Sequence, residues 1–219
     1  MNSHQIEIVE KTAQFIQKKF EGEGTGHDWH HIYRVWKSAE NIAKTEDCDP
    51  YIVSLSALLH DIADHKFYDG DLMEGSRQTK TWLKEIGADD DTIEKVADIV
   101  SRVSFKGANV KDDMPSIEGQ VVQDADRLDA IGAIGIARAF AYGGNKNRSL
   151  YDPSEKYEMH ESFDAYHKSE SSTIAHFYEK LLLLKDRIHT ATAKKIAEER
   201  HQYMETFLEQ FYGEWEGKR

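Results

Sequence analysis

The chain has 219 residues, of which 39% are hydrophobic and 11% aromatic, so it can bury one sizeable core. Its 28 lysines and arginines are outnumbered by 40 aspartates and glutamates, and the formal charge of −12 argues against a general nucleic-acid binder, which needs a basic face. A single cysteine excludes a disulfide framework, and no apolar run approaches the roughly 18 residues of a membrane span. We therefore expect a cytoplasmic protein without a membrane segment.

Apolar residues recur every three or four positions along the first third of the chain, which predicts amphipathic helices. The first helix is expected over residues 6–20, ahead of the glycine-rich stretch 22–26. Asp28 is a suitable N-cap for a second helix over 32–43. Asp49 followed by Pro50 predicts the start of a third helix, whose apolar run 55–59 leads directly into His60.

The remaining chain continues this helical pattern. A fourth helix is expected to end before Gly87, a fifth to open at Asp90 and Asp91, and a sixth to cover 121–131. The small-residue stretch 132–137 either lets two helices pack closely or breaks one helix into two. A polar loop over 143–162 and two helices near 172–185 and 193–212 complete an all-α fold. We predict a single globular bundle of about eight or more helices, in which helices over 163–212 pack on a ligand-bearing core, 27–131.

The end of the third helix predicts a metal site. Ionised side chains are costly beside a core unless they are paired or bound to a cation, and this apolar helix ends in His60 and Asp61. His31 and Asp126 can complete a mixed nitrogen and oxygen set suited to Mn²⁺, Fe²⁺, Co²⁺, Ni²⁺ or Zn²⁺. Neighbours on a helix diverge by about 100°, so the cation must lie between His60 and Asp61, which is easier where a helix ends. Taken singly, each residue is more often structural.

The ordered series of His31, the pair His60-Asp61 and Asp126 resembles the signature of the HD-domain metal-dependent phosphohydrolases. The segments 27–29, 60–67, 124–133 and 176–182 are similar to the bacterial subgroup of nucleoside triphosphate pyrophosphohydrolases. The resemblance implies an all-helical HD domain and four ligands to one divalent metal ion, with Mn²⁺ favoured and Mg²⁺, Co²⁺, Ni²⁺, Fe²⁺ or Zn²⁺ also suitable. It implies hydrolysis of nucleoside triphosphates to monophosphate and pyrophosphate by a metal-activated water.

The same resemblance separates neighbouring candidates and suggests further roles. It favours His31 over His30, and Asp126 over Asp124, as ligands. Asp64 lies one turn beyond His60 and is expected to act as general base, its alternative being a solvated helix cap. A triphosphate needs positive charge beyond the metal, so four residues are expected to bind substrate: Lys66, Arg127, His176 and Lys180. Three residues are expected to support the ligating side chains: His27, Asp28 and Asp129.

The spacing of His176 and Lys180, four residues apart, predicts that both lie on one helical face, although a lysine at the border of a core is an equal alternative for Lys180. The expected partner is a small nucleotide and not a nucleic-acid polymer; a homo-oligomer is compatible with the sequence. Two other functions remain open, a nucleotide phosphomonoesterase of the 5′-nucleotidase type and a nucleotide-sensing HD module without catalysis. A helical scaffold with core histidines is the plainest alternative.

Overall fold

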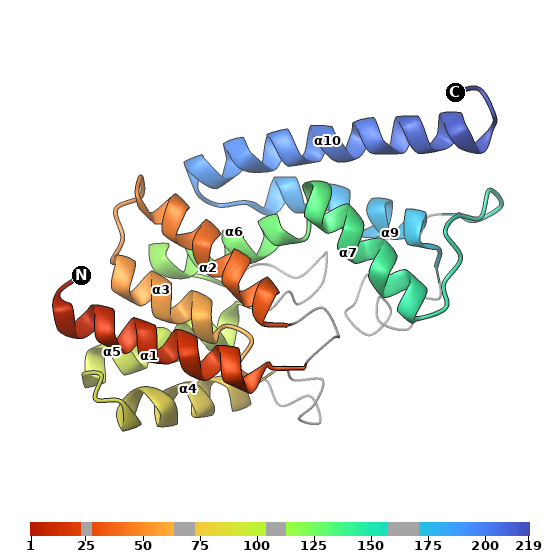
Figure 1. Ribbon diagram of the computed structural model, residues 1–219. Coiled ribbons are helices and arrows are strands. Elements are labelled where there is room, and N and C mark those ends of the chain that lie inside the picture. The colour runs from red at the N-terminus through yellow and green to blue at the C-terminus, as the bar shows by residue number, and fades with distance from the viewer. Residues whose placement is uncertain (23–27, 64–72, 104–112, 157–170) are drawn as a thin grey trace. The chain divides into compact units, whose positions relative to one another are not determined.

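The computed structural model describes residues 1–22, 28–63, 73–103, 113–156 and 171–219, and its regular structure is entirely helical (Figure 1). No strand occurs in these ranges, so the all-α prediction is confirmed. The described elements are nine α-helices and one 3-10 helix: α1 (Ser3–Lys19), α2 (Trp29–Ala43), α3 (Pro50–Leu59), α4 (Glu74–Glu85), α5 (Asp90–Arg102), α6 (Ile117–Asp129), α7 (Gly132–Asn145), α9 (Thr173–Glu179), η2 (Leu181–Arg187) and α10 (Ala191–Trp215).

The chain divides into two compact units. The first unit comprises residues 1–105 and 112–126, and the second comprises residues 106–111 and 127–219. Helix α6 belongs to both, because the boundary falls between Asp126 and Arg127. None of the helices described combines the length and the apolar character that crossing a bilayer requires.

Helix α3 is the centre of the first unit. Every residue from Tyr51 to Leu59 is buried, as expected for a helix that is apolar on all sides. It packs against α1, α2 and α5, which lie around it in Figure 1. The predicted start is confirmed, since the Asp49 side chain accepts a hydrogen bond from the Tyr51 N–H at 2.8 Å and Pro50 is the first helical residue. His60, the next residue after α3, therefore follows a rigidly packed element.

Helix α5 begins at Asp90, as the sequence predicts. Asp89 is the N-cap and accepts from the Thr92 N–H at 3.0 Å and from its hydroxyl at 2.7 Å. Asp90 and Asp91 lie in the first turn, where the positive end of the helix dipole favours carboxylates. All three aspartates have a suitable side chain, so composition alone does not select the capping residue.

The second unit is built from α7, α9, η2 and α10. Helix α10 packs on α7 and η2, and α9 packs on α7 and η2. Phe177 of α9 is fully buried, and its ring centroid lies 5.9 Å from that of Phe207 and 6.1 Å from that of Phe140. These rings join α7, α9 and α10 in one aromatic core.

Two helices of this part of the chain end where the local backbone leaves the helical conformation. Gly132 has φ +75°, a left-handed conformation that favours glycine, and it separates α6 from α7. The small-residue stretch therefore breaks a helix in two. The single helix predicted near 172–185 was wrong, because α9 ends at Glu179 and Lys180 has φ −143° before the 3-10 helix η2 begins. The leucine run 181–184 would show the same local sequence pattern in an α-helix and in the 3-10 helix that forms.

Candidate metal centre

His31 is held in the first turn of α2. The predicted N-cap is confirmed, since the Asp28 carboxylate accepts a hydrogen bond from the His31 N–H at 2.8 Å. The His31 residue is only 1% exposed, so its ring is buried. Asp28 thus supports His31 through its backbone.

The Nε2 atom of His60 faces His31 and has a defined protonation state. Its Nδ1 lies 2.8 Å from the carbonyl oxygen of Ala57, which can only accept, so Nδ1 carries the proton. Nε2 then keeps its lone pair, which is the arrangement that a metal-ligating imidazole needs. This nitrogen lies 3.3 Å from Nε2 of His31.

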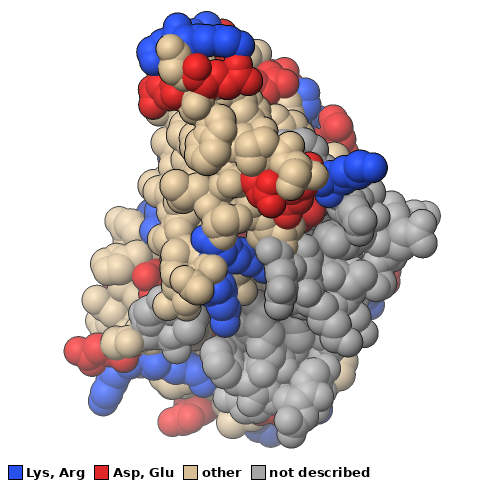
Figure 2. All heavy atoms as spheres, turned by 90° about the vertical axis from the view of Figure 1, so that its right-hand side faces the viewer, with Lys and Arg blue, Asp and Glu red and all other residues tan. Residues whose placement is uncertain are grey.

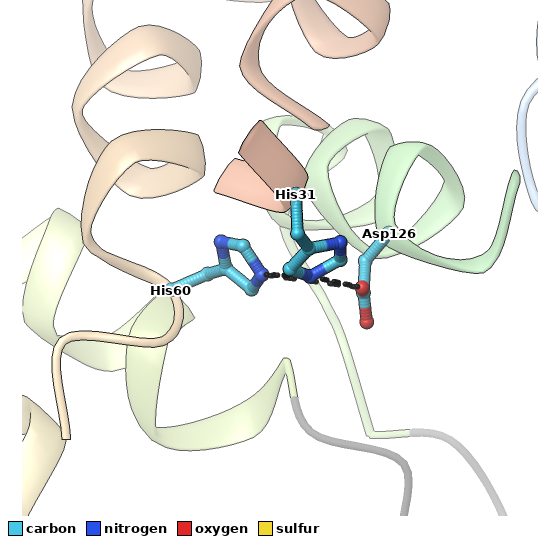
Figure 3. Close-up of side chains that lie close together, drawn as sticks. All are labelled: His31, His60 and Asp126. Carbon is cyan, nitrogen blue, oxygen red and sulfur yellow. Dashed lines mark hydrogen bonds and ion pairs between the residues drawn. The ribbon is translucent and has the colours of Figure 1, made fainter. Parts of the chain in front are cut away.

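Two carboxylates complete the group, which we call the His-Asp cluster: His31, His60, Asp61 and Asp126. Oδ1 of Asp126 lies 3.5 Å from Nε2 of His31 and 3.9 Å from Nε2 of His60. Figure 3 shows these three side chains pointing toward one another from α2, α6 and the end of α3. Oδ2 of Asp61 lies 3.5 Å and 3.4 Å from the same two nitrogens. His60 itself keeps helical dihedrals, φ −57° and ψ −33°, and the Asp61 carboxylate nevertheless reaches Nε2 of His60.

The His-Asp cluster fits one divalent cation. Ligand atoms that share an ion with bonds of about 2.1 Å lie roughly 3 to 3.5 Å apart. The facing atoms of His31, His60 and Asp126 all lie within 4.8 Å of one another. Two carboxylates beside two largely buried imidazoles also favour a positive charge between them, which a divalent cation would supply. The competing His30 is exposed, and the competing Asp124 is fully buried.

The other predicted site residues fall into two groups. Asp64, Lys66 and His27 lie outside the described residues. Arg127 and Asp129 lie in the second unit and make structural contacts there. The Arg127 guanidinium is buried and contacts Nε2 of His189 at 3.1 Å and the carbonyl oxygen of Arg187. The Asp129 carboxylate is also buried and pairs with Arg138.

His176 and Lys180 lie at the end of α9 in the second unit. Lys180 follows the last helical residue, although its N–H still donates to the His176 carbonyl oxygen at 3.1 Å. Lys180 is thus the C-cap of α9 rather than a residue of the helix, and its charge still acts on His176. Burial, followed by the charges of Lys180 and Arg148, lowers the pKa of His176 to about 3. Arg148 was not among the predicted residues, because it lies 28 positions before His176 and its proximity depends on tertiary structure.

The acidic stability of the protein tests this account of His176. Its imidazole stays neutral in the folded chain down to about pH 3, whereas in the unfolded chain it gains a proton below about pH 6.5. The free energy of unfolding should therefore fall as the pH drops from 6.5 toward 3, by up to about 1.4 kcal/mol per pH unit. Denaturant titrations with EDTA should show a shallower pH slope for His176→Gln than for the wild type. An unaltered slope in His176→Gln, or an equal change in the exposed control His4→Gln, would contradict it.

Basic and acidic side chains are interspersed on the surface that Figure 2 shows. At the C-terminal end of α10, at the top of Figure 2, basic and acidic side chains lie side by side, and Arg219 pairs with Glu209 while Lys218 pairs with Glu216. Below this group Figure 2 shows mainly uncharged residues and small groups of either sign. The described residues on this face form no continuous basic stripe.

Comparison with known proteins identifies the class. The HD domain family matches residues 28–131, the segment that contains all four side chains of the His-Asp cluster. A solved HD-superfamily hydrolase from Bacillus thuringiensis is 41% identical, with a TM-score of 0.78, and the match covers 97% of this chain and 99% of that one. The chain therefore belongs to the HD-domain family and is an HD-domain hydrolase.

A particular relative is the YpgQ protein of Bacillus subtilis. It is 39% identical over 208 residues, which cover 94% of this chain and 93% of YpgQ. The crystal structure of YpgQ in complex with ADP matches with a TM-score of 0.77 and 35% identity, and covers 96% of each chain. A protein from Listeria innocua of known structure matches with a TM-score of 0.77, 34% identity and 99% coverage of each chain.

Proposed function

We propose that this hydrolase is a metal-dependent phosphohydrolase of nucleotides, which converts nucleoside triphosphates to monophosphate and pyrophosphate. The observation that carries the proposal is the His-Asp cluster, in which two imidazoles and two carboxylates face one another at 3.3–3.9 Å. A relative that was crystallised with ADP supports a nucleotide as ligand. The acidic surface is compatible with such a small substrate, because a local cation outweighs the global field at short range.

The four cluster residues would hold one divalent cation, with Mn²⁺ favoured. When bound, the cation supplies Lewis acidity to a phosphoryl oxygen and to water. The chain itself keeps the ligand atoms in place. The bond from Nδ1 of His60 to Ala57 holds the His60 tautomer, and the Asp28 cap holds the turn that carries His31.

The remaining roles rest on the sequence. Asp64 accepts the proton of the attacking water, a role that the resemblance to the HD-domain phosphohydrolases implies for an acidic residue at this place. Lys66, Arg127, His176 and Lys180 bind the phosphates. His176 would do so as a neutral donor, because its pKa lies near 3.

Product analysis tests the proposed reaction. Metal-free protein is incubated with each nucleoside triphosphate, diphosphate and monophosphate and with Mn²⁺, Mg²⁺, Co²⁺ or Ni²⁺, and phosphate products are separated by ion chromatography. We expect pyrophosphate and monophosphate in equal amounts from triphosphates. Orthophosphate alone, released from monophosphates, would identify a phosphomonoesterase instead. Tight metal binding without turnover of any nucleotide would identify a sensing module.

Asp64→Asn tests the proposed base separately from the metal. The amide keeps the size of the side chain but no longer accepts a proton, so kcat should fall by roughly 100- to 10,000-fold. The dissociation constant for Mn²⁺ should stay close to that of the wild type, because Asp64 is not one of the proposed ligands. Both are measured on the same preparation, by initial rates and by calorimetric titration. Full turnover in Asp64→Asn would remove this residue from the mechanism.

A further inference from the structure

The last turn of α6 is held from outside the helix. Asp126 is directly followed by this turn, which consists of Arg127, Leu128 and Asp129. The last four carbonyl groups of an α-helix have no intrahelical partner, and helix ends fray unless other groups bind them. The carbonyl group of Asp126 is one of these four, so the side chain of Asp126 depends on the order of the turn.

Arg200 of α10 binds this turn. Its Nη1 donates a hydrogen bond to the carbonyl oxygen of Leu128, 72 residues earlier in the chain, which also accepts from the Ile131 N–H at 3.3 Å. Burial lowers the pKa of the Arg200 guanidinium, and the charge of Asp129 partly offsets this effect. Arg200 is half-buried, and the negative end of the helix dipole favours a cation at this position.

Arg138 of α7 binds the next residue. Its Nη1 donates to the Asp129 carboxylate and lies 3.4 Å from the Asp129 carbonyl oxygen. Two arginines from two different helices thus bind two successive residues at the end of α6. Basic side chains can cap a helix C-terminus by donating hydrogen bonds to its last carbonyl groups.

Gly132 leaves room for the Arg200 side chain. A Cβ atom on Gly132 would lie 2.9 Å from Cγ and 3.0 Å from Cβ of Arg200, closer than carbon atoms approach without displacement. The same glycine makes the break between α6 and α7. The absence of a side chain at Gly132 therefore lets the Arg200 side chain lie against the C-terminal end of α6.

We infer that Arg200, together with Arg138, is a positioning residue for the metal ligand Asp126. The inference rests on the proposed metal function. Ligand atoms must be held within about 0.5 Å of the productive geometry, and a supporting contact typically accounts for 10- to 100-fold of metal affinity. The two arginines order the turn that follows Asp126, so the Asp126 carboxylate is directed to the facing atoms of His31 and His60 before a metal binds.

The test compares metal affinities in the absence of nucleotide. Mn²⁺ is titrated calorimetrically into metal-free wild type, Arg200→Met, Arg200→Lys and the control Lys195→Met, which removes an exposed cation of the same helix. Binding that persists in His60→Ala is subtracted as non-specific. Arg200→Met should weaken Mn²⁺ binding about 10-fold, and Arg200→Lys, which keeps the charge and a donor, should recover most of the loss.

Several outcomes decide the inference. Wild-type affinity in folded Arg200→Met, or an equal loss in Lys195→Met, would overturn it. Failure of Arg200→Lys to recover affinity would also overturn it, since a general loss of packing is not rescued by charge. If Arg200→Met does not fold, Arg138→Gln replaces it, and unchanged affinity in that variant overturns the inference. The proposed function fails separately, when wild type itself binds no divalent cation at the His-Asp cluster.

Discussion

Replacing His60 by alanine is expected to abolish tight binding of a divalent cation and to lower nucleotide hydrolysis by at least about 1000-fold, because a catalytic metal stabilises charge by several kcal/mol. The Nε2 atom that is lost lies 3.3 Å from Nε2 of His31, 3.4 Å from Oδ2 of Asp61 and 3.9 Å from Oδ1 of Asp126. Without it, two carboxylates face one imidazole, and the remaining set holds a cation less tightly. Metal content by mass spectrometry and initial rates under saturating nucleotide give the two readouts.

His30→Ala is the matched control for this variant. His30 is also a helical histidine near the site, but it is exposed and lies outside the His-Asp cluster. It should keep the metal content of the wild type and change the rate less than about threefold, as expected for a surface substitution. Equal metal content in the wild type and His60→Ala, together with equal rates, would show that the cluster is not the metal centre.

Phe177→Ala is expected to lower the free energy of unfolding by about 3–5 kcal/mol, the range for loss of a buried phenylalanine. Phe177 is 0% exposed, and its ring lies against Phe140 of α7 and Phe207 of α10. Its removal would leave a cavity where three helices meet, and the second unit has no other fully buried phenylalanine among the described residues. Urea titration followed by far-UV circular dichroism measures the change.

The control for this variant lies on the same helix as Phe207. Tyr203 is 57% exposed, so Tyr203→Ala should change the free energy of unfolding by no more than about 0.5 kcal/mol. Both variants are measured in EDTA, so that metal binding in the first unit does not contribute. A loss below about 1 kcal/mol in Phe177→Ala would contradict the aromatic core described for the second unit.

Local features of the fold could be predicted from the sequence because their causes lie within a few residues. Asp28 and Asp49 cap helices through bonds to backbone groups two or three positions away. The apolar run of α3 is buried as a whole, and an apolar run predicts that burial directly. The ordered series of His31, His60-Asp61 and Asp126 indicated the family in the same way, since it depends only on residue type and order.

Tertiary structure decided what depends on distant segments. The packing of α2, α3 and α6 brings the side chains of His31, His60 and Asp126 to one place. Lys180 leaves the helix that its local pattern predicts, and Arg200 reaches Leu128 across 72 residues. Hydrophobic periodicity and capping are short-range properties, whereas such contacts form only when the chain has paid the entropy of closing long loops. The sequence by itself therefore determined the helices and the chemistry of the site, and the tertiary structure decided which groups hold that site in place.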